Sequence, residues 1–114
     1  MSATGAAFAL REWTGGPGGG PPLHVHHHDT EAWYVLEGTL RFRLADRTFD
    51  VAAGGCVFVP GGVAHTFNNP GPGDVRYLIV LTRRILDLIG ALHEDITPDR
   101  VAAVYRDYDS ELLE

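Results

Sequence analysis

The sequence predicts a small all-β domain, an antiparallel barrel or sandwich that ends in a tail of two short α-helices. Three observations predict it: short β-like runs follow one another over residues 32–81, turn formers separate them, and the periodicity becomes helical after Thr82. Strands this short and regularly spaced favour a closed antiparallel architecture that protects its edges. The 114 residues suffice for one modest core, so we expect a single domain over 1–114, with the barrel over about 6–82 and the helical tail over about 83–112.

The first expected elements are a strand and a loop. Residues 6–13 could form a short strand, and the Gly/Pro segment 14–22 then breaks regular structure. Only about a dozen residues precede this segment, so we interpret it as a loop inside the domain and not as a linker.

The central runs are expected to be strands joined by tight turns. They cover residues 32–37, 40–44, 48–51, 56–60, 64–68 and 75–81. In 40–44 the period is two, with Leu40 and Phe42 on the face opposite Arg41 and Arg43. Three glycines and Asn69 fall between runs, so we assign them to turns, or for Asn69 to a backbone hydrogen bond; the glycines are Gly38, Gly54 and Gly62. Cys56 is interpreted as a small buried hydrophobic residue.

Two apolar stripes predict the helices of the tail. Residues at i, i+3, i+4 and i+7 are apolar in both segments: Ile85, Leu88, Ile89 and Leu92, then Val101, Val104, Tyr105 and Tyr108. The second helix has a start signal, with Thr97 as N-cap and Pro98 at the first helical position. We expect both helices to pack on the outside of the barrel and assign them no chemistry.

Composition and charge exclude several classes of function. The net charge is -6 and the nine basic residues, all arginine, form no cluster, so nucleic acid is not an expected partner. The single cysteine excludes an intrachain disulfide and is compatible with a reducing cytoplasm. Residues 1–13 lack a basic start and a long apolar run, so we expect no signal peptide, no membrane span and a cytoplasmic location. The use of arginine without lysine indicates a bacterial genome of high G+C content.

The stretch 21–31, PPLHVHHHDTE, holds four of the six histidines. If its first part is extended, His24 and His26 project from the same face with Cα atoms about 6.5 Å apart. His27 then points the other way, and His28 lies where the chain turns, which leaves it as an alternative ligand. Glu31 opens the next strand, and a hairpin-like return brings its carboxylate beside the pair. Two histidines and one carboxylate suit iron, manganese, nickel, copper or zinc.

His65 is the candidate fourth ligand, because it follows a Pro-Gly turn within an otherwise apolar strand. A histidine between apolar neighbours is more often a buried core residue whose ring is hydrogen-bonded than a metal ligand. The presence of the motif with His24, His26 and Glu31 favours the interpretation of His65 as a ligand.

At this point the sequence resembles the cupin superfamily, as a small single-domain member. Its first motif matches at Gly18, His24, His26, Glu31 and Gly38, and its second motif at Gly54, Pro60, Gly62, His65 and Asn69. The resemblance covers about residues 18–81. It implies a small antiparallel β-barrel, a double-stranded β-helix similar to a jelly roll, in which His24, His26, Glu31 and His65 bind one divalent metal ion.

Neighbours of these residues are candidates for the wall of a pocket. Trp33 and Val35 share the face of Glu31 if that strand alternates, and three phenylalanines could also face the metal: Phe42, Phe58 and Phe67. Polar side chains that could reach the pocket are few: Tyr34, Arg41, Arg43 and Tyr77.

Two functional hypotheses remain open. The family that the sequence resembles includes dioxygenases, isomerases, epimerases, polyketide cyclases and binding modules without catalytic activity. The fold alone therefore does not identify the reaction. The favoured hypothesis is a metal-dependent enzyme that acts on a small organic molecule, either an oxygenase or an isomerase or cyclase that works through an enolate, with Glu31 as a ligand that also tunes catalysis. The alternative is a non-catalytic module that binds or senses a small molecule. We also expect a homodimer that pairs through residues 7–13.

Overall fold

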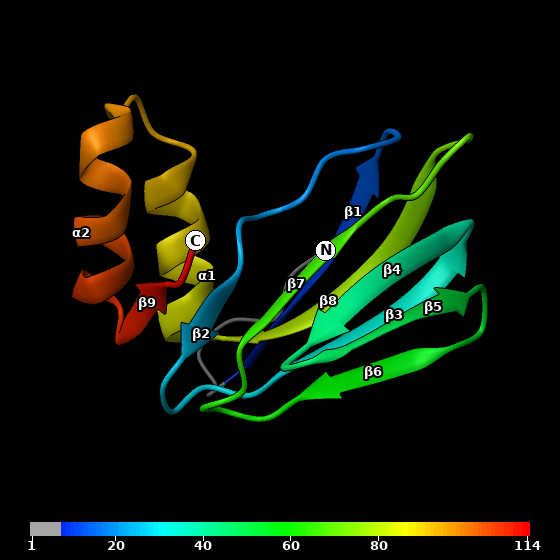
Figure 1. Ribbon diagram of the computed structural model, residues 1–114, viewed down its shortest axis with the longest axis horizontal. Coiled ribbons are helices and arrows are strands. Elements are labelled where there is room, and N and C mark those ends of the chain that lie inside the picture. The colour runs from blue at the N-terminus through cyan, green and yellow to red at the C-terminus, as the bar shows by residue number, and fades with distance from the viewer. Residues whose placement is uncertain (1–7) are drawn as a thin grey trace.

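The computed structural model describes residues 8–114, which form two antiparallel sheets and a helical tail (Figure 1). The first sheet has the order β1-β8-β3-β6, with β1 at Phe8–Gly15, β8 at Val75–Thr82, β3 at Glu31–Glu37 and β6 at Cys56–Val59. The second has the order β5-β4-β7-β2-β9, with β5 at Arg47–Ala52, β4 at Thr39–Leu44, β7 at His65–Asn68, β2 at His24–His26 and β9 at Ser110–Leu112. The predicted fold class is therefore confirmed.

Aromatic side chains from both sheets meet in the core. Trp33 of β3 and Phe42 of β4 are almost fully buried, and their ring centroids lie 5.2 Å apart in an edge-to-face arrangement. Phe67 of β7 contacts both rings, at 5.4 Å and 5.6 Å between centroids. Such pairs favour this geometry because the positive ring edge meets the negative ring face. The core thus joins the two sheets directly beside the strand ends that carry the histidines.

The phase of one strand differs from the prediction. In β6 the buried residues are Val57 and Val59, whereas Cys56 and Phe58 face outward, so the interpretation of Cys56 as buried is wrong. All four residues are apolar, so no polar residue marks which side faces water. In β4, where arginines alternate with apolar residues, the predicted faces are confirmed.

The turn assignments are confirmed where backbone geometry tests them. Gly38, Gly54 and Gly62 have φ values of 80°, 90° and 89°. A Cβ atom at Gly38 would lie 2.7 Å from the carbonyl oxygen of Asp74, so this position requires glycine on two grounds. Asn69 donates from its amide to the carbonyls of Gly15 and Gly73 at 3.2 Å and 2.8 Å. It therefore fixes the loop after β1, the segment expected at 14–22, of which the first two residues still belong to the strand. Ala6 and Ala7 of the predicted first strand lie outside the described residues.

The tail contains helix α1 (Arg83–Leu92), a 3₁₀ turn (Pro98–Arg100), helix α2 (Val101–Asp107) and strand β9. Helix α1 begins at Arg83, where the helical tail was expected to begin, and the Thr82 hydroxyl caps it by accepting a hydrogen bond from the amide of Ile85 at 3.3 Å. Thr97 occupies the N-cap position of the 3₁₀ turn that runs directly into α2, and Pro98 is its first residue, so the predicted start of this helical segment is correct, although the Thr97 side chain makes no capping hydrogen bond. Strand β9 was not predicted.

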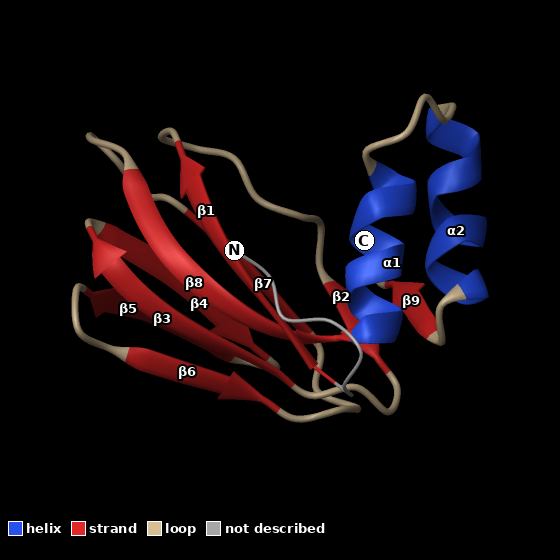
Figure 2. Cartoon of the chain, turned by 180° about the vertical axis from the view of Figure 1, so that it is seen from behind, coloured by secondary structure: helices blue, strands red, loops and turns tan. Residues whose placement is uncertain are grey.

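The helices lie side by side next to β2 and β9, on one side of the sheets (Figure 2). Their stripes contribute Ile85 and Leu88 of α1, and Val104 and Tyr105 of α2, to the buried core. Within residues 8–114, neither helix has the length and apolarity that crossing a membrane requires.

Candidate metal centre

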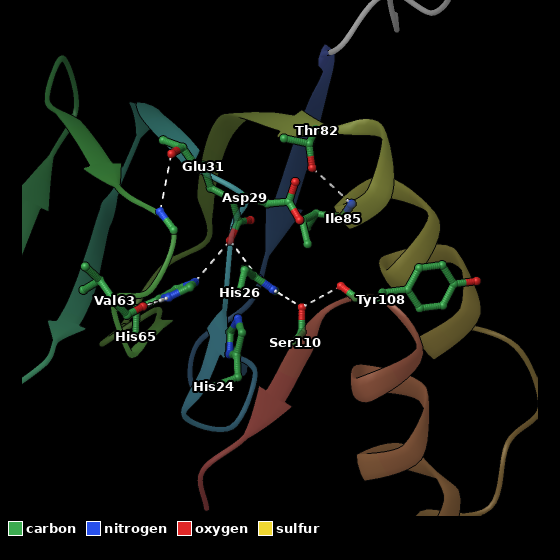
Figure 3. A network of polar contacts seen from close by, with 12 residues as sticks. His24, His26, Asp29, Glu31, Val63, His65, Thr82, Ile85, Tyr108 and Ser110 are labelled. Carbon is green, nitrogen blue, oxygen red and sulfur yellow. Dashed lines mark hydrogen bonds and ion pairs between the residues drawn. The ribbon is translucent and has the colours of Figure 1, made fainter.

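The four residues that the motifs selected come together at one point (Figure 3). His24, His26, Glu31 and His65 are all buried, and one nitrogen or oxygen atom of each lies within 4.8 Å of those of the others. Glu31 Oε1 is 2.9 Å from His26 Nε2 and 3.1 Å from His65 Nε2. The side chains therefore converge without any rearrangement of the backbone.

Strand pairing explains this convergence. His24 and His26 alternate with Val25 along β2 and thus project from one face, as the period of two requires. His24 lies opposite His65 in the pairing of β2 with β7, and Glu31 comes from the first residue of β3 in the other sheet. The centre consequently lies between the sheets.

Each imidazole is held by its Nδ1 atom. His24 Nδ1 is 2.8 Å from the carbonyl oxygen of Pro22, and His65 Nδ1 is 2.9 Å from that of Val63. A carbonyl oxygen only accepts, so both Nδ1 atoms carry the proton and leave the lone pair of the neutral ring on Nε2. His26 Nδ1 lies 2.7 Å from the hydroxyl of Ser110.

Electrostatics favour an ionised Glu31 and a neutral His24. In the metal-free protein, burial opposes ionisation of Glu31, but hydrogen bonds from His26 and His65, which require an additional proton on Nε2, outweigh it and lower the pKa of Glu31 from 4.5 to about 2. Burial, followed by the proximity of His65, lowers the pKa of His24 from 6.5 to about 4. At neutral pH the centre thus offers an anionic oxygen and a neutral His24.

This donor set fits a divalent metal ion. Two ligand atoms that each lie about 2.1 Å from one ion, at right angles, are about 3.0 Å apart, close to the 2.9 Å and 3.1 Å measured between Glu31 and the two imidazoles. Because Nδ1 carries the proton of each neutral ring, Nε2 presents a lone pair. A lone pair that faces a carboxylate is repelled by it unless a cation, either a proton or a metal ion, lies between the two atoms. The cluster could therefore hold a metal ion through three nitrogens and one oxygen, a set suited to iron, manganese, nickel, copper or zinc.

The other two histidines of the stretch stay outside this cluster. His27 and His28 are exposed, and His28 Nδ1 lies 2.6 Å from Asp109 Oδ2. Asp109 also accepts from Arg84 Nη1 at 2.7 Å, so His28 takes part in a surface ion-pair network. Coordination through His28, which the sequence left open, is not supported by its position.

A cavity of about 420 Å³ adjoins the four-residue cluster. Trp33 and Phe67 line it, as proposed from the sequence, and so does Tyr77. Most of the remaining wall is aliphatic or aromatic and includes Trp13, Leu40, Val75, Ile79, Ile85, Leu88, Ile89, Leu92 and Tyr105. The candidate site is therefore a polar cluster at the wall of an apolar chamber.

Three other residues proposed for the pocket lie elsewhere. Val35 and Phe42 are fully buried in the core and do not border the cavity. Phe58 is 70% exposed on the outer face of the first sheet, because β6 has the opposite phase from the one assumed. Placing these three at the cavity was wrong.

Most polar candidates are also outside. Arg41 makes a bidentate ion pair with Asp50 at 2.8 Å and 3.1 Å, Arg43 pairs with Glu114, and Tyr34 is 40% exposed. Of the four, Tyr77 alone borders the cavity.

The tail contributes side chains to the cavity wall that sequence reasoning missed. Helix α1 supplies much of one cavity wall, and Tyr105 of α2 packs its ring against His24 at 5.5 Å between centroids. His93, at the end of α1, also lines the cavity and stacks on Trp13 at 5.8 Å. The helices do lie beside the sheets, as expected, but they also form part of the cavity wall, which was not predicted. Their apolar stripes were visible in the sequence, but a stripe does not reveal what it faces.

Comparison with known proteins agrees with this geometry. The sequence profile of the Cupin domain family matches residues 11–81. Mannose-1-phosphate guanylyltransferase 2 of Escherichia coli O157:H7 is 44% identical over 55 residues, which is 48% of this chain and 11% of the relative. Alginate biosynthesis protein AlgA of Pseudomonas aeruginosa is 33% identical over 67 residues, 59% of this chain and 14% of the relative. The chain thus corresponds to a small part of these curated relatives.

Solved structures show the same fold. The polyketide cyclase RemF from Streptomyces resistomycificus superposes with a TM-score of 0.61 at 36% identity, over 68% of this chain and 56% of that one. A sugar phosphate isomerase of the cupin superfamily from Silicibacter pomeroyi gives 0.62 at 27%, over 68% and 52%. The Cnp3 cupin domain of Schizosaccharomyces pombe gives 0.65 at 21%, over 79% and 63%, a likeness of fold alone. Because the family profile matches residues 11–81, and because both motifs and the double-stranded β-helix are present, the chain belongs to the cupin domain family.

Proposed function

We propose that this protein is a metal-dependent cupin enzyme that isomerises or cyclises a small apolar carbonyl compound through its enolate. The observation that carries the proposal is the position of the His24, His26, Glu31 and His65 cluster at the wall of an apolar cavity of about 420 Å³. A purely structural metal site is normally closed by its ligands, whereas a catalytic one keeps access to a cavity. The likeness to a polyketide cyclase at 36% identity supports this class of reaction.

The lining of the cavity favours an aromatic or polyketide-like substrate over a sugar phosphate. The chain contains no lysine, and no arginine is found among the described residues that line the cavity. A phosphate group would therefore lack the cationic partner that such groups usually require. Trp33, Phe67 and Tyr77 instead offer ring surfaces against which a planar apolar molecule can pack.

The chain's own groups suggest how the reaction could proceed. A divalent ion, when bound, supplies Lewis acidity toward a ketone oxygen and so favours the enolate form of the substrate. His93 Nδ1 lies 2.7 Å from the carbonyl oxygen of Ile89 and so carries its proton, which leaves the lone pair on Nε2. We assign to His93 the transfer of the α-proton: Nε2 accepts it from carbon, the enolate carbon bonds to a second carbonyl carbon, and the proton passes to the resulting alkoxide.

The hydroxyl groups of Tyr77 and Tyr105 are proposed as hydrogen-bond donors to the substrate. Burial raises the pKa of Tyr77 to about 12, and burial followed by the charge of Glu31 raises the pKa of Tyr105 to about 12. Both hydroxyls therefore remain protonated at neutral pH, and we expect them to orient substrate oxygens by donating hydrogen bonds.

The test is reconstitution with single metals. Protein purified without a histidine tag and loaded with iron(II), manganese, nickel or zinc is incubated with aromatic β-dicarbonyl and polyketide-like compounds, with and without oxygen. The proposal expects conversion by the zinc or nickel form without oxygen, because Lewis acidity suffices, and loss of conversion in His93→Phe. Conversion that requires oxygen and the iron form would instead indicate an oxygenase, and binding without conversion by every metal form would indicate a non-catalytic module.

A further inference from the structure

Each of the three histidines of the metal centre is held by a hydrogen bond to its Nδ1 atom, and one of these three hydrogen-bond partners is a side chain from the C-terminal tail. His24 and His65 are held by the backbone carbonyls of Pro22 and Val63, whereas His26 is held by the hydroxyl of Ser110. Ser110 is 2% exposed and begins β9, 84 positions along the chain from His26. It also lies outside residues 11–81, the part that matches the family profile.

The direction of these hydrogen bonds is fixed by chemistry. Ser110 Oγ lies 3.0 Å from the carbonyl oxygen of Tyr108, which only accepts, so the hydroxyl proton is donated there (Figure 3). The Ser110 oxygen must then accept from His26 Nδ1, at 2.7 Å. His26 is thereby held in the tautomer whose lone pair lies on Nε2, the atom 2.9 Å from Glu31.

We infer that Ser110 is a positioning residue of the metal centre, and that the C-terminal strand therefore sets the affinity and geometry of the ion at His26. The inference rests on the proposed function in one respect, that the centre binds a divalent ion. An outer partner of this kind fixes ring orientation and raises the basicity of the ligand nitrogen. It acts on the ion through His26 and does not touch the substrate.

The docking of β9 does not depend on this hydroxyl. The strand pairs with β2 over three residues, from His24 opposite Leu112 to His26 opposite Ser110. On either side of it, the amide of His27 donates to the Asp109 carbonyl at 3.0 Å, and the amide of Leu113 to the Leu23 carbonyl at 2.9 Å. Removing one hydroxyl should therefore leave the strand in place, which separates a positioning role from a merely structural one.

The experiment compares Ser110→Ala with Glu111→Ala in the full chain. Glu111 lies in the same strand but is exposed, so its substitution controls for disturbance of β9 alone. Zinc affinity is measured by competition with a chromophoric chelator, cobalt(II) coordination by visible absorption, and docking of β9 in the metal-free protein by hydrogen exchange of residues 108–114. We expect Ser110→Ala to lower zinc affinity by about 10- to 100-fold and to change the cobalt spectrum, with wild-type exchange of β9. Glu111→Ala should match wild type in all three measurements.

Two results would overturn the inference. One is a Ser110→Ala variant with wild-type zinc affinity and an unchanged cobalt spectrum. The other is a loss of affinity accompanied by faster exchange of β9 in the metal-free variant, because detachment of the strand would then explain the loss. Failure of the shared premise, that the centre binds a divalent ion, looks different, since wild-type protein itself would then bind neither zinc nor cobalt(II) at the cluster. Metal binding without turnover would contradict the proposed function and leave this inference intact.

Discussion

The hydrogen bond made by Nδ1 of each histidine determines which of its ring nitrogens faces the metal centre. His24, His26 and His65 each have Nδ1 bonded to an oxygen outside the cluster, so their Nε2 atoms are free to bind. Glu31 adds the negative charge, and its pKa of about 2 keeps it ionised in any ordinary buffer. Metal binding should therefore depend on these four side chains and not on the number of histidines nearby.

Alanine substitutions test that dependence. His26→Ala and His65→Ala should each lower metal affinity on the order of a hundredfold or more, because loss of an outer partner alone costs about 10- to 100-fold. His27→Ala is the matched control, since His27 is adjacent in sequence but exposed. Metal content of untagged protein after dialysis checks the prediction, and equal losses in all three variants would mean that other imidazoles bind the ion.

Glu31→Gln tests the role of charge. The amide keeps the shape of the side chain but is neutral, which changes the pKa of water on the ion and its redox properties, so turnover should fall even in molecules that retain metal. The control is Glu37→Gln, because Glu37 is an exposed carboxylate on the same strand that pairs with Arg76. Turnover per bound metal is the measurement, and an unchanged value in Glu31→Gln would remove Glu31 from the catalytic account.

Among individual residues, the sequence identified the four candidate ligands but not most of the side chains that surround them. The intervals in 18–38 and 54–69 selected the four clustered residues, because alternation along β2 and the turn before β7 are local properties. Ser110 carries no such signal, since its contact with His26 is made by a distant strand. Phe58 was misplaced because an all-apolar run does not define its buried face.

Helix α1 is the element whose role differs most from its prediction. Its stripe was recognised, but the periodicity of a helix identifies an apolar face without identifying the partner of that face. The stripe borders the cavity through Ile85, Leu88, Ile89 and Leu92. The size and shape of the space available to a substrate are therefore set in part by the tail.

Leu88→Ala tests this arrangement. Leu88 is 1% exposed, so its truncation should lower the free energy of unfolding by about 2–5 kcal/mol and enlarge the cavity, while metal content stays unchanged. Arg83→Ala is the control on the same helix, and it should leave stability nearly unchanged because its pair with Asp87 is exposed. Urea unfolding supplies the measurement, and a similar small effect in both variants would argue against packing of α1 on the cavity.

For the whole molecule, the outer face of the first sheet is the feature that bears on assembly. Strand β1 lies at the edge of that sheet, and most of the large exposed apolar side chains lie on its outer face: Phe8, Leu10, Tyr34, Phe58 and Val80. Leu10 and Val80 are register partners, and so are Ala32 and Phe58. Exposed apolar patches of this kind mark interfaces more often than ordinary surface, which keeps the homodimer expected from the sequence as a prediction.

Light scattering tests the prediction of a homodimer. Wild-type protein at micromolar concentration should have twice the mass of one chain, and Leu10→Glu should shift it to monomer, because a buried unpaired charge at an interface is costly. Thr48→Glu is the control, since it adds the same charge to an exposed position on β5, an edge strand of the other sheet. A monomeric wild type would exclude the dimer.

The central claim is that one divalent ion binds among His24, His26, Glu31 and His65, at the wall of the apolar cavity. Anomalous diffraction from crystals of untagged, metal-loaded protein, collected above and below the absorption edge of the metal, tests it most directly. The account predicts a single strong peak per chain at about 2.0–2.2 Å from one Nε2 atom of each histidine and one oxygen of Glu31. A peak beside His27 and His28 instead, or none at the buried cluster in fully loaded crystals, would contradict it.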